Sequence, residues 1–404
     1  MPTTEALPTR DAISASEIAA LRRRFPTEPE TEALLERKMA ARADGPYRRP
    51  TLAQMTRLVT SFLEDRLETP FRLEAPRWSS GGVSKIQMVF TLDWLSPDRG
   101  QVRDEMVVRM DPDESLNATS RVREYEVLGA VASHLPVPEV FWIDAGGTHF
   151  PQPALVYAFV EGVSKPPGTG AGQVTGLGTN FGEHFRPLLA PQFMTTLATI
   201  HTLQLDPATV PSMAAPEPGT TQAALLQLNR ARRVWEEDRA EDVPLMDVAA
   251  AWLEENVPVT DRISLVHGDF RSGNFLFDPD TADVTAWLDW ERCHLGDRHR
   301  DLAWTTQLTF GHWEGDRYLV CGLIPLDEFY EQYESASGLR VDPARLHYFR
   351  VLNAFQILAA LVGTGHRVIR LRKSHQGISL ARLRGQAASI SDDLRRLLEE
   401  GAHG

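Results

Sequence analysis

Three oxygen-bearing side chains stand close together in the segment from Leu265 to Glu291, LVHGDFRSGNFLFDPDTADVTAWLDWE. Asp269 is followed five residues later by Asn274, and Asp289 comes after an intervening polar turn. Carboxylate and amide oxygens bind Mg²⁺ together with phosphate oxygens, and a carboxylate can accept the proton of a reacting hydroxyl. These residue types therefore point to phosphoryl transfer from a nucleotide to a hydroxyl group.

The elements around these residues would bring them together. SLVHGD reads as a strand that enters a turn, and FLF and VTAWLDW read as two strands joined by the turn DPDTAD. Because the strands of a hairpin run antiparallel, Asn274 and Asp289 at its two ends should lie side by side. Asp269, on the loop before Asn274, would face the same point. Protein kinases use this order, with a base Asp, an Asn five residues later and a metal-binding Asp farther on.

The rest of the chain predicts a small mixed lobe followed by a helical one, an α+β architecture. From Leu188 onward helical patterns dominate, interrupted only by the segment above. We assign residues 1–50 to an N-terminal extension that either packs on the body or stays mobile, 51–158 to the N-lobe and 159–404 to the C-lobe. The N-lobe elements predicted from pattern are a helix at 52–67, strands at 84–94 and 105–110, a helix at 120–135, and strands at 141–145 and 153–162.

HGDFRSGN followed by LDWE resembles the aminoglycoside/choline phosphotransferase family, the small-molecule relatives of protein kinases. The resemblance covers roughly residues 51 to 370, and its C-terminal part, FYEQYESASGLRVDPARLHYFRVLNAF, is similar to the branch of kinase-like modules fused to some acyl-CoA dehydrogenases. The other matching motifs are GGVSK (81–85) for the phosphate loop, YAFVEG (157–162) for the segment joining the lobes, LATIHTL (197–203) and GDRHRDLAW (296–304).

The resemblance implies a bilobal protein-kinase-like fold that binds ATP between its lobes. It also implies the roles of single residues. Asp269 would be the catalytic base, and Asn274 and Asp289 would hold Mg²⁺. Arg109 stands where protein kinases carry a Lys that contacts the nucleotide phosphates. Because Arg is permanently charged and can bind phosphate in a bidentate manner, Arg109 would keep the electrostatic role of that Lys. The residues assigned to nucleotide binding are Gly81, Gly82, Ser84, Arg109, Glu124 (the ion-pair partner of Arg109), Tyr157 and Phe159.

Several other polar residues are predicted to be structural. His267 should brace the catalytic loop, and His201 should pack beneath it. Asp297 and Asp301 should cap backbone N–H groups of loop and helix starts. The two cysteines, Cys293 and Cys321, have no partner pattern for metal or nucleophilic chemistry, so we expect them to be buried or incidental.

Composition limits the class of protein. The formal net charge of −13 argues against general nucleic-acid binding, which needs a basic face. Two cysteines give no disulfide framework, so a cytoplasmic compartment is expected. The N-terminus lacks the pattern of a secretory signal. The longest apolar stretch, VLNAFQILAALVG (351–363), is expected to be too short and too polar to span a membrane.

The sequence leaves two chemical classes open for the hydroxyl compound that accepts the phosphate. HRVIRLRKSH (366–375) clusters Arg367, Arg370, Arg372 and Lys373, which form either a solvated basic face or a basic rim for a hydroxy acid or a hydroxyacyl-CoA. The segments FGHWEGDRYLV and LDEFYEQYESAS supply the acids that an aminoglycoside-like antibiotic would need. The alternative to an enzyme is a catalytically idle nucleotide-binding module. The Gly-rich loop at 162–182 is either a linker or a lid, and oligomeric state and the choice of ATP or GTP are left open.

Overall fold

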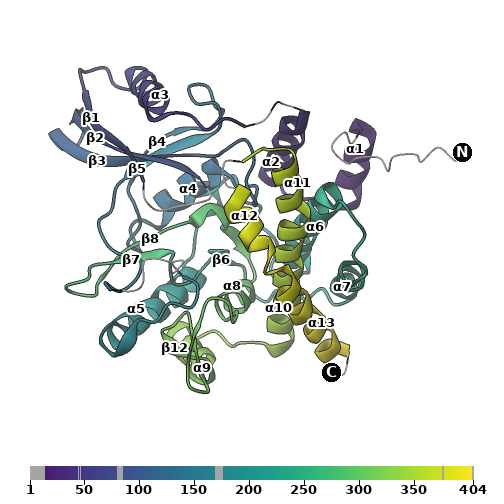
Figure 1. Ribbon diagram of the computed structural model, residues 1–404. Helices are drawn as coiled ribbons and strands as arrows, with labels where there is room; N and C mark the ends of the chain where they lie inside the picture. The colour runs from purple at the N-terminus through teal and green to yellow at the C-terminus, as the bar shows by residue number, and fades with distance from the viewer. Residues whose placement is uncertain are drawn as a thin grey trace, which may run out of the picture.

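The computed structural model describes residues 14–43, 45, 47–79, 85–168, 176–374 and 377–402 (Figure 1). A sheet with two helices forms one lobe, and a larger set of helices forms the other (Figure 1). The fold is therefore α+β and bilobal, as the sequence predicts. Phosphate-loop residues Gly81, Gly82 and Ser84 lie outside the described residues.

The N-lobe is built on a five-stranded antiparallel sheet with the order β1-β2-β3-β5-β4. Helix α3 (Leu52–Glu64) packs its buried face, which includes Met55, Val59 and Phe62, on the core that holds β2. Helix α4 (Arg121–Val131) contacts β4 and β5. The strands are β1 (Arg72–Trp78), β2 (Ile86–Ser96), β3 (Gly100–Met110), β4 (Val140–Asp144) and β5 (Ala154–Ala158).

The C-lobe surrounds one large apolar core. Two short antiparallel strand pairs carry the candidate site. β6 (Ser264–Val266) pairs with β9 (His294–Gly296), and β7 (Phe275–Phe277) forms a hairpin with β8 (Val284–Trp287). The helices are α5 (Gly182–Thr202), α6 (Gln222–Asp238), α7 (Pro244–Glu255), α8 (His299–Thr305), α9 (Leu326–Ser337), α10 (Pro343–Leu358), α11 (Gly365–Arg370), α12 (Gly377–Arg384) and α13 (Ala387–Ala402).

Two expectations about the C-lobe need correction. From Leu188 onward only helices were predicted outside the segment 265–291, but the chain after α8 forms a three-stranded sheet. Its strands are β10 (His312–Glu314), β11 (Arg317–Val320) and β12 (Ile324–Pro325). The apolar stretch at 351–363 belongs to a continuous helix of 28 residues, Pro343–Arg370, so it is longer than expected. By length and composition this helix could cross a membrane, but 72% of its most apolar window is buried inside the protein.

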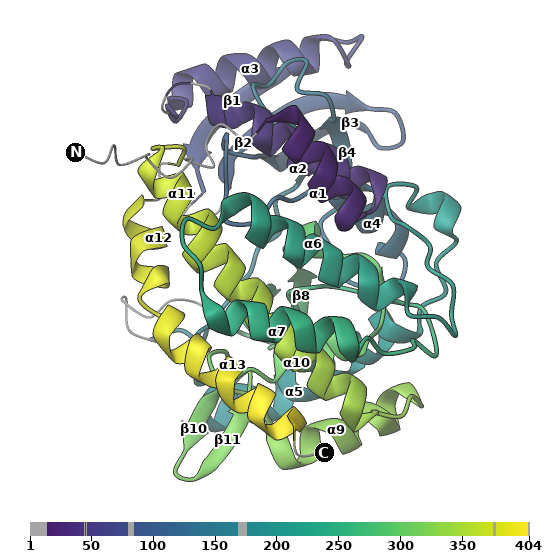
Figure 2. The ribbon, with the colours of Figure 1, turned by 90° about the vertical axis from the view of Figure 1, so that its right-hand side faces the viewer.

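The N-terminal extension packs on the body. Helices α1 (Ala15–Arg24) and α2 (Pro29–Ala40) lie against α6 (Figure 2). The buried carboxylate of Asp238, at the end of α6, pairs with Lys38 and with Arg42, the latter at 2.5 Å. Arg367 of α11 contacts the same carboxylate at 3.1 Å. The ion cluster therefore ties the extension to two helices of the C-lobe.

Candidate active site

The loop between β6 and β7 is held from beneath by one buried carboxylate. Asp301, in the first turn of α8, accepts the backbone N–H groups of His267 at 2.7 Å and Gly268 at 2.8 Å. His201 of α5 lies 3.3 Å from Asp301 and 2.8 Å from the hydroxyl of Tyr333. The predictions that Asp301 caps the loop and that His201 packs beneath it are confirmed.

His267 braces the same loop sideways, as predicted. Its Nε2 lies 3.1 Å from the carbonyl oxygen of Leu288, and its Nδ1 accepts the N–H of Asp269 at 3.3 Å. Burial lowers the pKa of His267, although Asp301 and Asp269 oppose this effect. The ring is therefore neutral and carries its proton on Nε2, an arrangement that suits a structural residue.

Asp269 projects from this loop with 18% of its side chain exposed. Its Oδ1 accepts the indole N–H of Trp304 at 2.7 Å and the guanidinium Nε of Arg271 at 3.0 Å. In the part of the chain that the structure describes, no donor reaches Oδ2. One oxygen of the carboxylate is therefore fixed, and the other is available.

The hairpin places Asn274 and Asp289 next to the loop that carries Asp269. The backbone N–H of Leu288 donates to the carbonyl oxygen of Asn274 at 2.8 Å, which sets the two hairpin ends side by side as predicted. The Asn274 amide donates to the backbone oxygen of Asp269 at 2.8 Å. Asp289 adopts a left-handed backbone with φ of 62°, and 39% of its side chain is exposed.

The N-lobe reaches this point through Arg109 of β3. Its Nη1 lies 3.3 Å from Glu124 of α4, so the predicted ion pair is present. The same atom lies 2.7 Å from Asp289, and Nη2 lies 2.7 Å from Glu291. Burial alone would lower the pKa of Arg109, but the three carboxylates raise it well above its usual range. Arg109 therefore links the two lobes at the candidate metal-binding residue.

Three charged residues at this junction were not assigned from the sequence. Lys85 contacts Asp111 at 2.8 Å and Glu291 at 3.4 Å, and it donates to Thr119 at 2.6 Å. Arg121 contacts Glu291 at 2.8 Å and also pairs with Glu124. Burial would raise the pKa of Glu291, but Lys85, Arg109 and Arg121 lower it. The only sequence signals were Lys85 at the end of GGVSK and Glu291 at the end of LDWE.

Tyr157 and Phe159 lie where the chain leaves β5 for the C-lobe. Tyr157 is buried, and burial raises its pKa to about 12. Phe159 donates its backbone N–H to the carbonyl oxygen of Glu105 at 2.8 Å. The guanidinium of Arg77 lies 5.5 Å from the centroid of the Phe159 ring.

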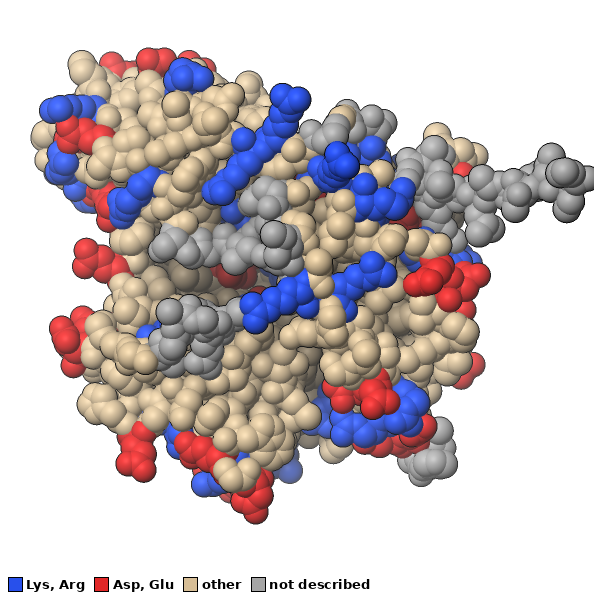
Figure 3. Space-filling model, in the orientation of Figure 1, with Lys and Arg blue, Asp and Glu red and all other residues tan. Residues whose placement is uncertain are grey.

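In the space-filling view, acidic atoms are visible in the hollow between the two lobes (Figure 3).

The described ends of the Gly-rich loop lie against the site. Val163 bridges to Phe277 through two backbone hydrogen bonds. A Cβ on Gly273 would come within 2.8 Å of the Cα of Gly176, so two backbones meet there without room for a side chain. The loop is therefore packed on the catalytic loop at 176. Its predicted middle, residues 169–175, lies outside the described residues.

The remaining candidate residues are buried or paired. Asp297 accepts the backbone N–H of His299 at 3.0 Å, which fits its predicted capping role. Cys293 and Cys321 are buried free thiols, as expected. The predicted basic rim at 366–375 is wrong for two of its four cations, because Arg367 and Lys373 are buried and turned to internal partners.

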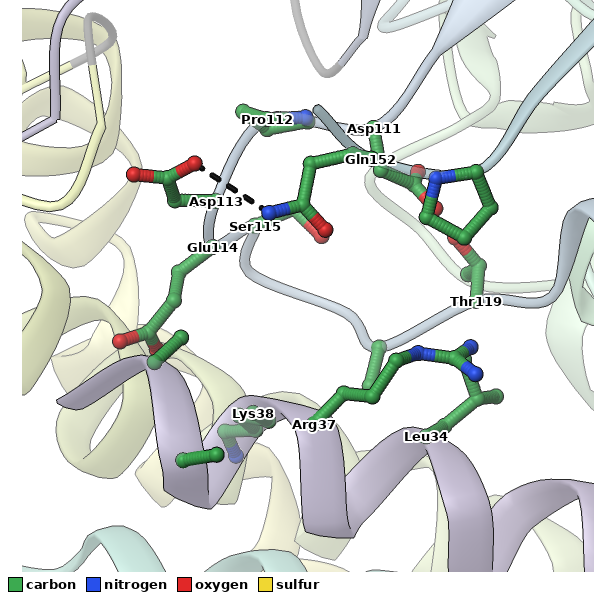
Figure 4. A pocket seen from close by; sticks show the side chains of 14 residues that line it. Leu34, Arg37, Lys38, Asp111, Pro112, Asp113, Glu114, Ser115, Thr119 and Gln152 are labelled. Carbon is green, nitrogen blue, oxygen red and sulfur yellow. Dashed lines mark hydrogen bonds between the residues drawn. The ribbon is translucent and has the colours of Figure 1, made fainter. Parts of the chain in front are cut away.

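A separate cavity of about 320 Å³ lies between α2, the loop after β3 and residues 152–153 (Figure 4). Its acidic wall consists of Asp111, Asp113 and Glu114, and each carboxylate is already engaged by a neighbouring side chain. None of the oxygen-bearing residues of the candidate site lines this cavity.

Residues 94–349 match the phosphotransferase enzyme family, more than half of the chain. This protein belongs to that family. Acyl-CoA dehydrogenase family member 11 of Gallus gallus is 31% identical over 155 residues, which are 35% of this chain and 20% of that protein. An aminoglycoside 3'-phosphotransferase of Streptomyces fradiae is 30% identical over 112 residues, 27% of this chain and 38% of that enzyme. The predicted family is confirmed, and the predicted similarity to kinase-like modules of acyl-CoA dehydrogenases is found in the first of these relatives.

Two solved structures share the fold at low sequence identity. A putative aminoglycoside phosphotransferase from Ralstonia eutropha superposes with a TM-score of 0.59 at 20% identity, covering 85% of this chain and 98% of that one. An ethanolamine kinase from Plasmodium vivax superposes with a TM-score of 0.53 at 10% identity, covering 88% of this chain and 94% of that one. The chain spans only about a fifth of the acyl-CoA dehydrogenase relative named above.

Proposed function

We propose that this chain is an ATP-dependent phosphotransferase that moves the γ-phosphate of ATP to a hydroxyl group of a small molecule. One observation carries the proposal. A single loop and a single hairpin bring Asp269, Asn274 and Asp289 together, and Arg109 reaches Asp289 from the other lobe. Family membership supports the same reaction class.

Asn274 and Asp289 fit Mg²⁺. The Asn274 amide nitrogen donates to the backbone of Asp269, so the amide oxygen is the atom that would bind a metal ion, and Oδ2 of Asp289 accepts no hydrogen bond from the described residues. Both are hard oxygen donors of the kind Mg²⁺ prefers. Among the described residues, no three His, Cys, Asp or Glu side chains are arranged so that they could hold a metal ion together, and Mg²⁺ is usually bound through only one or two protein carboxylates. When bound, Mg²⁺ would neutralise charge on the terminal phosphates.

Asp269 would act as the base. Its free Oδ2 accepts the proton of the acceptor hydroxyl while the hydroxyl oxygen attacks the γ-phosphorus. The new oxygen–phosphorus bond forms as the bond to the β-phosphate oxygen breaks, and ADP leaves. Arg109, oriented by Glu124, would contact the phosphates. Gly81, Gly82 and Ser84 would add backbone contacts to them, and Tyr157 and Phe159 would flank the nucleotide.

Charges around Asp269 favour an anionic acceptor. The guanidinium of Arg292 lies 4.4 Å from the ring centroid of Trp304 and forms no ion pair within the described residues. Several of the acids that an aminoglycoside would need already pair with arginines: Glu314 pairs with Arg186, Glu328 with Arg317 at 2.5 Å, and Glu334 with Arg340 at 2.8 Å. Arg292 would bind a carboxylate or a phosphate of the acceptor. We therefore propose a hydroxy acid or a hydroxyacyl-CoA as the acceptor.

A panel of hydroxyl compounds tests the proposal. It holds hydroxy acids, hydroxyacyl-CoAs, aminoglycosides, macrolides, amino alcohols and sugars, each incubated with Mg·ATP and read by product mass. We expect a phosphorylated hydroxy acid or hydroxyacyl-CoA with the native chain. Asp269→Asn should keep ATP binding and lower turnover by on the order of 10² to 10⁴, the span for a positioned base. Near-normal turnover in Asp269→Asn would reject Asp269 as the base.

One observation favours a second candidate function. Arg109 lies 2.7 Å from Oδ1 of Asp289 and so engages half of the carboxylate that would hold the metal. A nucleotide-binding module without turnover could keep such a contact permanently. That module would bind Mg·ATP in the same panel and form no phosphorylated product.

A further inference from the structure

Asp269 is held by two donors at a single oxygen. The indole Nε1 of Trp304 and the Nε of Arg271 both donate to Oδ1, at 2.7 Å and 3.0 Å. A carboxylate that turns about its terminal bond can exchange its two oxygens, because rotation there is only weakly restricted. Two donors on one oxygen remove this freedom. Oδ2 accepts no hydrogen bond from the described residues, and 18% of the Asp269 side chain is exposed.

Trp304 is itself rigidly placed. Its ring is 7% exposed, and the guanidinium of Arg292 and the ring of Phe310 lie 4.4 Å and 5.4 Å from it. It stands on α8 three residues after Asp301, on the same face of the helix. Asp301 fixes the backbone of the catalytic loop, and Trp304 fixes the carboxylate at its tip. One short helix thus sets both the position and the rotation of Asp269.

We propose that Trp304 is a positioning residue which, together with Arg271, presents Oδ2 of Asp269 to the acceptor hydroxyl. This inference rests on the proposed role of Asp269 as the base. Trp304 acts through Asp269 and contacts no reacting atom. Its indole N–H, rather than its bulk, carries the role, so removal of this one donor should reduce turnover while nucleotide binding stays the same.

A double-mutant cycle separates this role from simple packing. Trp304→Phe, Asp269→Asn and the double variant are compared in transfer from ATP to the panel compound that is turned over, with release of inorganic phosphate to water as a second readout. Trp304→Phe should lower kcat by on the order of tenfold, since hydrogen bonds to charged groups are worth at least that factor. KM for ATP should not change. In the Asp269→Asn background, Trp304→Phe should cost nothing further.

The controls keep the outcomes distinct. Trp252→Phe, a partly buried ring on α7 outside the site, tests the general cost of the substitution. Thermal unfolding of each variant shows whether the fold is kept. If Trp304→Phe lowers kcat equally in both backgrounds, or leaves kcat unchanged, the positioning role is overturned while Asp269 remains the base. If Asp269→Asn alone retains native turnover, the proposed function fails as well.

Discussion

At the scale of single residues, Asp269 and Asp289 each engage one carboxylate oxygen with neighbouring side chains. Asp269 uses Oδ1 for Trp304 and Arg271, and Asp289 uses Oδ1 for Arg109. In each case the described residues leave Oδ2 open. The open oxygens suit a proton in one case and a metal ion in the other.

Asp289→Ala should weaken the binding of Mg·ATP, because it removes one of the two residues that we propose hold the metal. The Kd should rise by more than about tenfold. Loss of a residue that only supports a metal ligand already weakens metal binding by about that factor. Isothermal titration with a non-hydrolysable ATP analogue, with and without Mg²⁺, measures it. Asp269→Asn serves as the control and should bind the analogue normally. Unchanged affinity in Asp289→Ala would remove Asp289 from the metal site.

Arg292→Met should raise KM for an anionic acceptor by on the order of tenfold, because a charge-assisted hydrogen bond is lost. KM for ATP should stay the same. Arg292→Lys keeps the positive charge and should recover part of the loss. Steady-state kinetics on a hydroxyacyl-CoA and on kanamycin compare the two acceptor classes. Loss of activity toward kanamycin but not toward the hydroxyacyl-CoA would contradict the anionic assignment.

At the scale of elements, sequence patterns located the hairpin and the N-lobe strands but not β1 or the small sheet β10–β12. β1 contains Pro76, has a register shift between Glu74 and Arg77, and buries no residue fully. The strands of the small sheet are two to four residues long. Such segments carry too few alternating apolar positions to stand out. No sequence pattern predicted that residue 176 packs on the catalytic loop either.

Gly273→Ala should destabilise the catalytic loop. Its φ of +97° disfavours a side chain, and a Cβ would lie 2.8 Å from the backbone of Gly176. We expect a loss of about 1–3 kcal/mol in the free energy of unfolding from the conformational strain, and a further loss from the contact. Gly315→Ala, with φ of +63° and open space, is the matched control. Urea unfolding measures both, and equal losses would show that the contact with Gly176 is unimportant.

At the scale of the whole molecule, charged contacts tie the extension and both lobes together. Glu28 contacts Arg123 of α4 at 2.7 Å, while Lys38 pairs with Asp238 of α6. The helix pair α1–α2 therefore touches the N-lobe and the C-lobe at once. Near this junction and beneath the catalytic loop the interior also holds histidines that burial keeps neutral.

Stability should fall as the pH drops below about 6.5. Burial lowers the pKa of His201 and His267, and that of His294 to about 3. Below the usual histidine pKa of about 6.5 the unfolded chain binds protons that the folded chain does not, so unfolding is favoured. Each such group contributes up to about 1.4 kcal/mol per pH unit within its window.

Urea unfolding between pH 8 and pH 5 tests this dependence. His294→Gln should flatten the curve, whereas His134→Gln, at an exposed position, is the control. Asp238 and Asp301, whose pKa values are lowered, keep their stabilising charge throughout this range and lose it only under stronger acid. A pH-independent free energy of unfolding over this interval would contradict the neutral state of the buried histidines.

The sequence by itself determined the family, the bilobal fold and the order of Asp269, Asn274 and Asp289. Those residues are placed by one loop and one hairpin, and such local geometry follows from short-range spacing. Only the tertiary structure decided which groups surround them. Trp304 reaches Asp269 from 35 residues away in sequence, Arg121 reaches Glu291 from 170 residues away, and Lys85 reaches Glu291 from farther still. Arg367 is buried. Contacts between distant segments depend on how the elements pack, and no local pattern encodes that packing.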